Sequence, residues 1–539
     1  MLLLAILTAC NDEASDGLAA ERLVRASMAM RGVHPSVAEL DRIAADPGSL
    51  EAIARSWLDD PRIGDTVRDM HAEELLVRID AQPHPPAIGA LGDYDLGEIA
   101  RSLDEEPLRA IAEVVTSGRP YTEILTGTTA MADPIVSAAY GLPHDPNGAE
   151  WQPSWWTDGR PVAGILSSST LWQRHMSSDT NHHRARAKLV ADVFLCDDIE
   201  LRSDAGIVEP ALAEEAVDAD PACTICHSVL DPLASAMSGV RRYVLPSETT
   251  NAIALGCPDD LAWACFPIGM WDESLQEADA MLPPPALYGV PVDSLADLGQ
   301  AVVSDPRFPE CTARRFFGYF ARIPPAQVDA SVASELAEAF VASGFDAREL
   351  MLAAALHDRF APGAALDHVG TLQARPEQLA RTIEALTGYR FRGDPSVPGC
   401  DPCWGPVDFA TTDAFGLRTL MGGVDGWDVV DPEPRPLPTR EIAIAWWAEE
   451  AAAFVVDHDA AAVPEERTLL AEGVPSSPAL VRRQLAALHV AILGEWVAEG
   501  DLDASVALWD GAFARSGDAA HAWKVVVAAM LQDDRLVMY

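Results

Sequence analysis

Apolar side chains recur at helical spacing through most of this chain of 539 residues. The pattern is clearest in four segments, residues 186–196, 335–345, 442–456 and 481–499. The third segment is rich in alanine, the residue with the highest helix propensity, and carries Trp446, Trp447 and Phe454. Runs in which apolar and polar residues alternate, as they do in a half-buried strand, are scarce. The sequence therefore predicts a mainly α protein.

Segments rich in proline and glycine interrupt this pattern, and they are typical of loops or joints between domains. They lie at residues 82–92, 141–161, 282–291, 361–370, 393–405 and 431–438. Because a domain takes roughly 100–200 residues, the length predicts two to four domains. We place an N-terminal helical module at 21–125, a central helical region at 126–360 and a C-terminal helical module at 361–539.

A short signature ends four of the predicted helical runs, at residues 57–63, 303–308, 356–360 and 531–536. In each, Asp stands shortly before Arg and an apolar residue, in two cases with Pro between Asp and Arg. The Asp side chain can cap the next helix, and Pro fits its first turn. The signature therefore predicts a corner between two helices.

The composition excludes two classes of protein. Apolar residues make up 49% of the chain, which provides packed cores and is unlike the composition of a disordered chain. Acidic residues outnumber basic ones by 83 to 38, for a formal net charge of −45. Because such a surface repels phosphate backbones, we expect no nucleic-acid partner.

Residues 1–10 form a short apolar run that ends in small residues and Cys10. It is too short to span a bilayer, which takes about 20 apolar residues, and it is typical of a signal peptide. Leu7-Thr8-Ala9-Cys10 resembles the lipobox of bacterial lipoproteins, which implies lipidation of Cys10 and a polar tether at 11–20. No Lys or Arg precedes the run, so a start further upstream, a poor signal or a frayed apolar end stay open. We expect a lipid-anchored protein of the cell envelope, facing the periplasm or the surface.

Cysteine usage agrees with export. Six cysteines are left when Cys10 and the pair at 223 and 226 are set aside, and they are Cys196, Cys257, Cys265, Cys311, Cys400 and Cys403. An oxidising compartment allows three disulfides among them. Local spacing favours the loops 257–265 and 400–403 and leaves Cys196 for Cys311, although six cysteines allow about 15 pairings. Residues 400–403 also have the spacing of a redox motif, but no βαβ pattern surrounds them.

One motif carries recognisable chemistry, Cys223-Thr-Ile-Cys226-His227. The pattern C-x-x-C-H is typical of covalent c-type haem attachment. Two thiols one helical turn apart can form thioethers to the two vinyl groups of one haem, and the adjacent His then binds the iron. Composition alone predicts roughly 0.004 occurrences in this chain. Zinc would need four ligands, and no second Cys/His pair is suitably spaced nearby. A disulfide with an incidental His is the other interpretation.

The residues around this motif resemble the planctomycete-type cytochrome c domain family, large exported proteins built of several modules. The family follows C-x-x-C-H with a D-P-L-G-F-A segment, and here Asp231-Pro232-Leu233 follows at the same spacing. Upstream, Gly164-Ile165-Leu166 and Leu195-Cys196 match further family segments, and the resemblance covers about residues 20–360. It implies one covalent haem c per chain but no established reaction. The family's Gly-Phe-Ala is replaced here by Ala234-Ser235-Ala236, which predicts an atypical haem pocket.

The sequence identifies the second axial ligand of the iron less clearly than it identifies the first, His227. Electron-transfer haems take His/Met or bis-His pairs. Met281 is 54 residues after His227 and precedes two prolines, so we take His227 and Met281 as the metal ligands. Open alternatives are Met237, Met270, His175, His182 and His183, and arginines that could pair with haem propionates are Arg241, Arg314 and Arg315.

Three functions follow as hypotheses. The leading one is a membrane-anchored monohaem cytochrome that exchanges electrons with a partner oxidoreductase. The second is a surface scaffold or adhesion lipoprotein whose haem site is structural or vestigial. The third is a peroxidase-like haem enzyme with an open iron position. Signature motifs of hydrolases, metalloproteases and nucleotide-binding folds are absent from the sequence, so we assign no catalytic residue.

Overall fold

The structure is a computed structural model that describes most of the chain. The described residues are 18–79, 85, 87, 89–178, 180–199, 221–242, 266–275, 283–362, 372–393, 407–409, 412, 417–435 and 437–539. Helix accounts for 62% of the structure and strand for 4%. The prediction of a mainly α protein is therefore confirmed. Within the described ranges, no helix is both long enough and apolar enough to cross a membrane.

The first part of the chain is an assembly of helices. It consists of a helix over residues 18–31, α2 Val37–Ala45, α3 Leu50–Arg55, α4 Arg62–Leu75 and α5 Leu96–Thr116, with short 3₁₀ turns at Pro47–Ser49 and Gly89–Leu91. Ser36 and Asp95 each accept a hydrogen bond from the third residue of the helix that follows, in capping boxes completed by Glu39 and Glu98. These caps satisfy main-chain N–H groups that a helix start leaves without partners.

The central part alternates short helices with small hairpins. Its helices are α6 Glu123–Thr126, α7 Pro134–Tyr140, α8 Ser169–Arg174, α9 Arg184–Leu195, α11 Pro221–Ser235, α14 Leu295–Ser304, α15 Arg307–Ala321, α16 Ala330–Ala342 and α17 Ala347–Leu356. Two antiparallel strand pairs join β1 Ala130–Ala132 with β2 Gln152–Ser154 and β3 Ala286–Leu287 with β4 Val290–Pro291. In the first pair Met131 lies opposite Pro153. Short 3₁₀ turns occur at Pro325–Gln327 and Asp358–Phe360.

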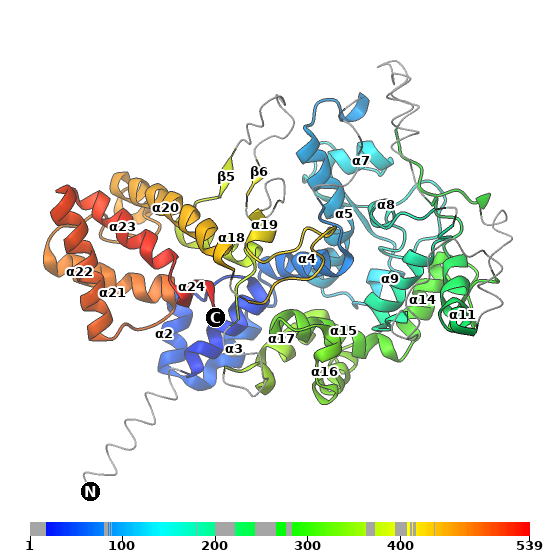
Figure 1. The fold of residues 1–539 in the computed structure, drawn as a ribbon, viewed down its shortest axis with the longest axis horizontal. Coiled ribbons are helices and arrows are strands. Elements are labelled where there is room, and N and C mark those ends of the chain that lie inside the picture. The colour runs from blue at the N-terminus through cyan, green and yellow to red at the C-terminus, as the bar shows by residue number, and fades with distance from the viewer. Residues whose placement is uncertain are drawn as a thin grey trace, which may run out of the picture.

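The C-terminal part contains the longest helix. Its elements are α18 Pro376–Thr387, β5 Arg392–Gly393, β6 Val407–Asp408, α19 Leu417–Leu420, α20 Pro438–Ala461, a 3₁₀ turn at Pro464–Glu466, α21 Pro478–Leu493, α22 Glu499–Ser516, α23 Ala519–Leu531 and α24 Asp534–Val537. The prediction of one helix across 481–499 is wrong, because Gly494 in the left-handed region ends α21. Figure 1 shows α20 to α23 at one end of the molecule and α9, α11 and α14 at the other.

Two hydrophobic clusters form the interior. The first runs from Ala20 to Ala374 and also takes in Tyr539, so the helices of 21–125 and of 126–360 share one core. The second runs from Leu379 to Val537 and is built mainly on α20, α21 and α23. A main-chain bond of 2.9 Å from the N–H of Ala374, in the first cluster, to the carbonyl of Val537, in the second, joins the two clusters.

The Asp–Arg signature forms the predicted helix corners at three of its four places. Asp60, Asp305 and Asp533 each accept the main-chain N–H of the Arg two residues later, at 3.0, 2.9 and 3.0 Å. The same carboxylates also accept a hydrogen bond from the Nε of that arginine, at 2.8–2.9 Å. At 356–360 the ring nitrogen of His357 takes this role instead, and it accepts the N–H of Arg359 at 3.1 Å.

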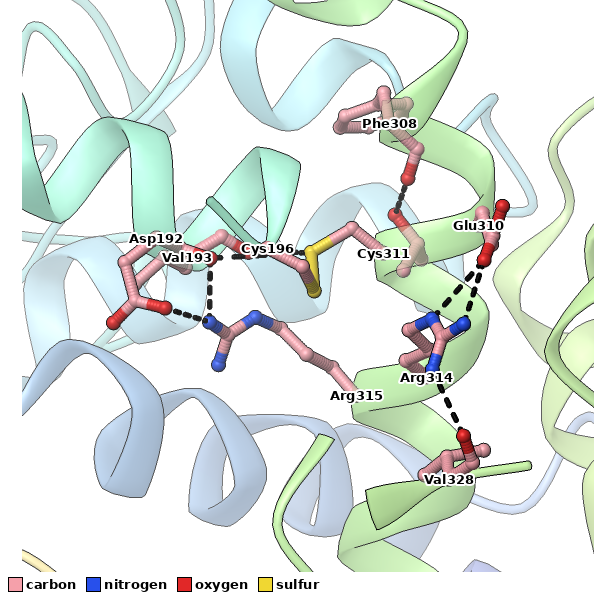
Figure 2. The surroundings of a disulfide bond; sticks show 10 residues. Asp192, Val193, Cys196, Phe308, Glu310, Cys311, Arg314, Arg315 and Val328 are labelled. Carbon is pink, nitrogen blue, oxygen red and sulfur yellow. Dashed lines mark hydrogen bonds and ion pairs between the residues drawn. A yellow bond between two sulfur atoms is a disulfide. The ribbon is translucent and has the colours of Figure 1, made fainter. Parts of the chain in front are cut away.

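A disulfide joins the end of α9 to α15, as Figure 2 shows. Cys196 and Cys311 are 115 residues apart in sequence, and their Cα atoms are 5.3 Å apart. Beside the bond, Arg315 donates to the carbonyl and the carboxylate of Asp192, at 2.6 and 3.2 Å. The predicted pairing of Cys196 with Cys311 is confirmed. The remaining cysteines of the two predicted short loops, residues 257–265 and 400–403, lie outside the described residues.

We predict that this disulfide contributes substantially to stability. Closing a loop of 115 residues reduces the entropy of the unfolded chain and contributes on the order of 5 kcal/mol. The double variant Cys196→Ala/Cys311→Ala should therefore have a lower free energy of unfolding by about that amount, measured by urea denaturation. Under reducing conditions, the free energy of unfolding of the wild-type protein should fall toward that of the variant. An unchanged unfolding midpoint would contradict the prediction.

His71 on α4 is a buried histidine whose two ring nitrogens both have partners. Its Nδ1 donates to the carbonyl of Val67 at 2.7 Å, and the Tyr121 hydroxyl donates to Nε2 at 2.6 Å. His71 is 1% exposed. Burial lowers the pKa of His71 to about 4 and raises the pKa of Tyr121. The pair is therefore neutral at pH 7, with its hydrogen bonds satisfied.

The neutral state of His71 predicts a loss of stability in acid. An unfolded histidine takes up a proton near pH 6.5, whereas His71 in the fold does so only at about pH 4. The free energy of unfolding should fall as the pH falls from 6.5 to 4, and His71 accounts for about 3 kcal/mol of that fall. We expect His71→Gln to weaken this pH dependence in urea denaturation, while His521→Gln, at an exposed site on α23, leaves it unchanged. Equal pH dependence in all three proteins would refute the assignment.

Candidate functional site

The C-x-x-C-H motif lies on α11, where Cys223 and Cys226 are one helical turn apart. Residues three apart on a helix share a face. Both side chains are partly exposed, and among the described cysteines these two are thiols rather than disulfide partners. The Cys226 thiol donates to the carbonyl of Ile199 at 3.3 Å. The helix thus carries two accessible thiols on one face, with His227 directly after them.

The two halves of α11 differ in burial. In the first half Ile225 is 48% exposed, whereas Leu233 and Ala234 near the end are fully buried. The Ser235 hydroxyl lies 2.6 Å from the carbonyl of Pro283, across from the helix. The end of α11 is therefore anchored in the core by Leu233 and the small residues that follow it. The motif lies on the exposed half.

His227 is held by a carboxylate on the next turn of its own helix. Its Nδ1 lies 3.0 Å from Oδ1 of Asp231. Arg184, at the start of α9, donates its Nε to the same oxygen at 2.6 Å and its Nη2 to Oδ2 at 3.2 Å. Burial opposes ionisation of Asp231, but the hydrogen bonds from His227 and Arg184 outweigh it and hold the pKa of this carboxyl below its usual value. A charged carboxylate makes Nδ1 the protonated nitrogen, which leaves the lone pair on Nε2.

Two of the histidines that could serve as a second axial ligand are engaged elsewhere. Nε2 of His175 lies 2.8 Å from the carbonyl of Leu75 at the end of α4. His183 is 1% exposed, and Arg186 donates to its Nδ1 at 3.0 Å. Burial first, and the nearby arginine second, lower the pKa of His183 to about 2. His182 is also buried, and both it and His183 adopt left-handed backbone conformations. His183 would have to give up its bond from Arg186 to bind a metal, whereas the bond to Leu75 engages only Nε2 of His175.

The other candidate ligands and charges are placed as follows. Met281 lies outside the described residues, as does Cys10. Met237 and Met270 are buried in the first hydrophobic cluster. The candidate propionate partners are in ion pairs: Arg241 lies 3.2 Å from Asp272, Arg314 lies 2.8 Å from Glu310 and Arg315 lies 3.2 Å from Asp192. In the described part of the chain, no group of three His, Cys, Asp or Glu side chains is arranged to hold a metal ion.

The sequence interpretation did not identify Arg184 or the link between His227 and Asp231. A signal for the link exists, because residues four apart on a helix are neighbours. Nothing in the sequence pointed to Arg184, which is 47 residues from Asp231. The sequence interpretation also missed a polar cavity of about 630 Å³ between α5 and α18. In this cavity Arg78 and Arg381 form ion pairs with Asp69. The ion pair of Asp69 with Arg381 joins the N-terminal helices to the C-terminal part.

Comparison with protein-family models, with curated proteins and with solved structures finds no match for this chain.

Proposed function

We propose that this protein is an exported, membrane-anchored monohaem c-type cytochrome that transfers electrons to or from a partner oxidoreductase. One observation carries the proposal. On the exposed half of α11, two partly exposed thiols one turn apart stand beside a histidine whose Nδ1 is held by a carboxylate. Thiols at this spacing suit the two thioether bonds of haem c, and a histidine held in this way has Nε2 available for iron.

The donor set on α11 fits haem better than it fits a closed zinc site. Zinc in structural sites takes four Cys or His ligands, whereas the motif supplies Cys223, Cys226 and His227 alone. Cys223 and Cys226 would hold the haem covalently, and His227 would be its axial ligand. The bound group would supply a one-electron ferric/ferrous couple. The chain's own residues orient the ligand through Asp231 and anchor its helix in the core through Leu233.

The proposal includes an anchor and a partner. Lipidation of Cys10 would hold the protein on a membrane of the cell envelope, with the polar tether at 11–20 as spacer. A haem on an exposed half-helix would be within reach of a redox partner protein, because electron exchange requires close approach. The formal net charge of −45 supplies negative charge that a docking partner can complement.

A peroxidase-like haem enzyme is the second candidate function. The observation that favours it is the bond from His227 to Asp231, because a carboxylate partner makes a histidine ligand more electron-donating. The visible spectrum separates the two functions. A low-spin spectrum with a reversible α-band supports electron transfer, and a high-spin iron that reacts with peroxide supports the enzyme. If the matured protein carries no haem, the scaffold lipoprotein is the hypothesis that remains.

We predict that Cys223→Ser/Cys226→Ser abolishes covalent haem, since serine forms no thioether. The protein should be produced with the c-type maturation machinery and examined by haem staining after denaturing electrophoresis. Ser228→Ala, an exposed change on the same helix, serves as the control and should keep the stain. Haem that survives acid–acetone extraction in the double variant would disprove the attachment site. A wild-type protein without haem would refute the proposed function.

A further inference from the structure

We propose that Asp231 and Arg184 together set the reduction potential of the iron bound by His227. In this inference, which rests on the proposed function, Asp231 lowers the potential and Arg184 limits that effect. The three side chains form one hydrogen-bonded unit across α9 and α11. Asp231 is a positioning residue, because it acts through His227 and does not itself bind the iron.

The local geometry of α11 presets the bond between His227 and Asp231. The two residues are four apart, so their side chains extend from adjacent turns of one face. The resulting Nδ1–Oδ1 distance is 3.0 Å, and their side chains are 24% and 13% exposed. A hydrogen bond to a charged partner at this depth is stronger than one between neutral groups. The bond therefore holds both the ring orientation and the tautomer that leaves Nε2 free to bind a metal.

Arg184 shares the carboxylate with the histidine. Its Nε donates to Oδ1, the same oxygen that accepts from His227, and its Nη2 donates to Oδ2. The guanidinium neutralises part of the carboxylate's charge, so less negative charge acts on the imidazole. Without Arg184, the full negative charge of Asp231 would act on His227. The two residues therefore affect the histidine in opposite directions.

The direction of the effect on the iron follows from ligand chemistry. A carboxylate that accepts a hydrogen bond from Nδ1–H makes Nε2 a more basic ligand. A more electron-donating ligand stabilises the ferric state relative to the ferrous state, and the reduction potential falls. Reduction of the bound group would place one electron, supplied by the partner oxidoreductase, on the iron, and no covalent bond would form or break. If the ion pair were purely structural, its removal would change the stability of the protein but not the reduction potential.

The test is a redox titration of the matured protein and its variants. Asp231→Asn removes the charge and should shift the ferric/ferrous equilibrium at least tenfold toward ferrous, a rise of about 59 mV for one electron. Arg184→Gln should lower the potential instead. The double variant should match Asp231→Asn, since Arg184 acts only through the carboxylate. Asp231→Glu, which keeps the charge, should stay closer to wild type than Asp231→Asn does.

A matched control and a haem-free measurement complete the test. Asp192→Asn removes one negative charge from α9, and it should leave the potential unchanged, because Asp192 pairs with Arg315 and not with the motif. In Cys223→Ser/Cys226→Ser protein, nitrogen NMR above pH 8 should show His227 protonated on Nδ1, and adding Asp231→Asn should shift the proton toward Nε2. His227→Gln identifies the signal.

Three results would overturn the inference. They are an unmoved potential in Asp231→Asn, shifts of the same sign in Asp231→Asn and Arg184→Gln, and an Nε2–H tautomer in the haem-free parent. A wild-type protein that matures without haem would instead overturn the proposed function, while the NMR measurement would still report on the His227–Asp231 bond.

Discussion

The fold depends on buried arginines that satisfy main-chain carbonyls far away in the sequence. Arg25 donates to the carbonyl of Phe360 at 3.1 Å, and Arg440 donates to that of Ala374 at 2.9 Å. Arg375 joins the carbonyl of Tyr319 to the carboxylate of Glu73. Loops that leave the helices would otherwise bury carbonyls without donors, and this costs free energy. The cost of burying the cations is visible at Arg440, whose pKa burial lowers to about 10. In a chain with 83 acidic and only 38 basic residues, part of the scarce positive charge is used in the interior.

The same device positions the candidate site. Arg186, fully buried near the start of α9, donates to four carbonyls, those of Trp172, His175, Arg241 and Arg242. The other end of α9 is tied to α15 by the disulfide of Cys196. A helix fixed at both ends gives Arg184 a defined place from which it reaches Asp231, and through Asp231 it supports His227. The geometry of the motif thus depends on contacts made well outside it.

Burial divides α11 between structure and chemistry. Its last turns lie in the core, and its first turns carry the two thiols at the surface. Such a division suits a group that must be attached from outside and then exchange electrons with another protein. A half-buried helix provides both: its buried end is held by the core, and its exposed end is accessible to the group and to the partner protein. The proposed function and the proposed role of Asp231 both use this arrangement.

The sequence by itself determined the local features. Helical periodicity predicted α9, α16 and α20 to within a few residues, and the Asp–Arg signature predicted helix corners at Asp60, Asp305 and Asp533. These features depend on residues within one or two turns, so the sequence carries them directly. Only the tertiary structure decided that Arg184 meets Asp231, or that His175 bonds to Leu75 across 100 residues. Such pairs are set by how whole helices pack, and one arginine among 38 basic residues carries no local mark of its partner. The pairing of Cys196 with Cys311 lies between these cases, because elimination suggested it and the packing of α9 on α15 brought the two cysteines together.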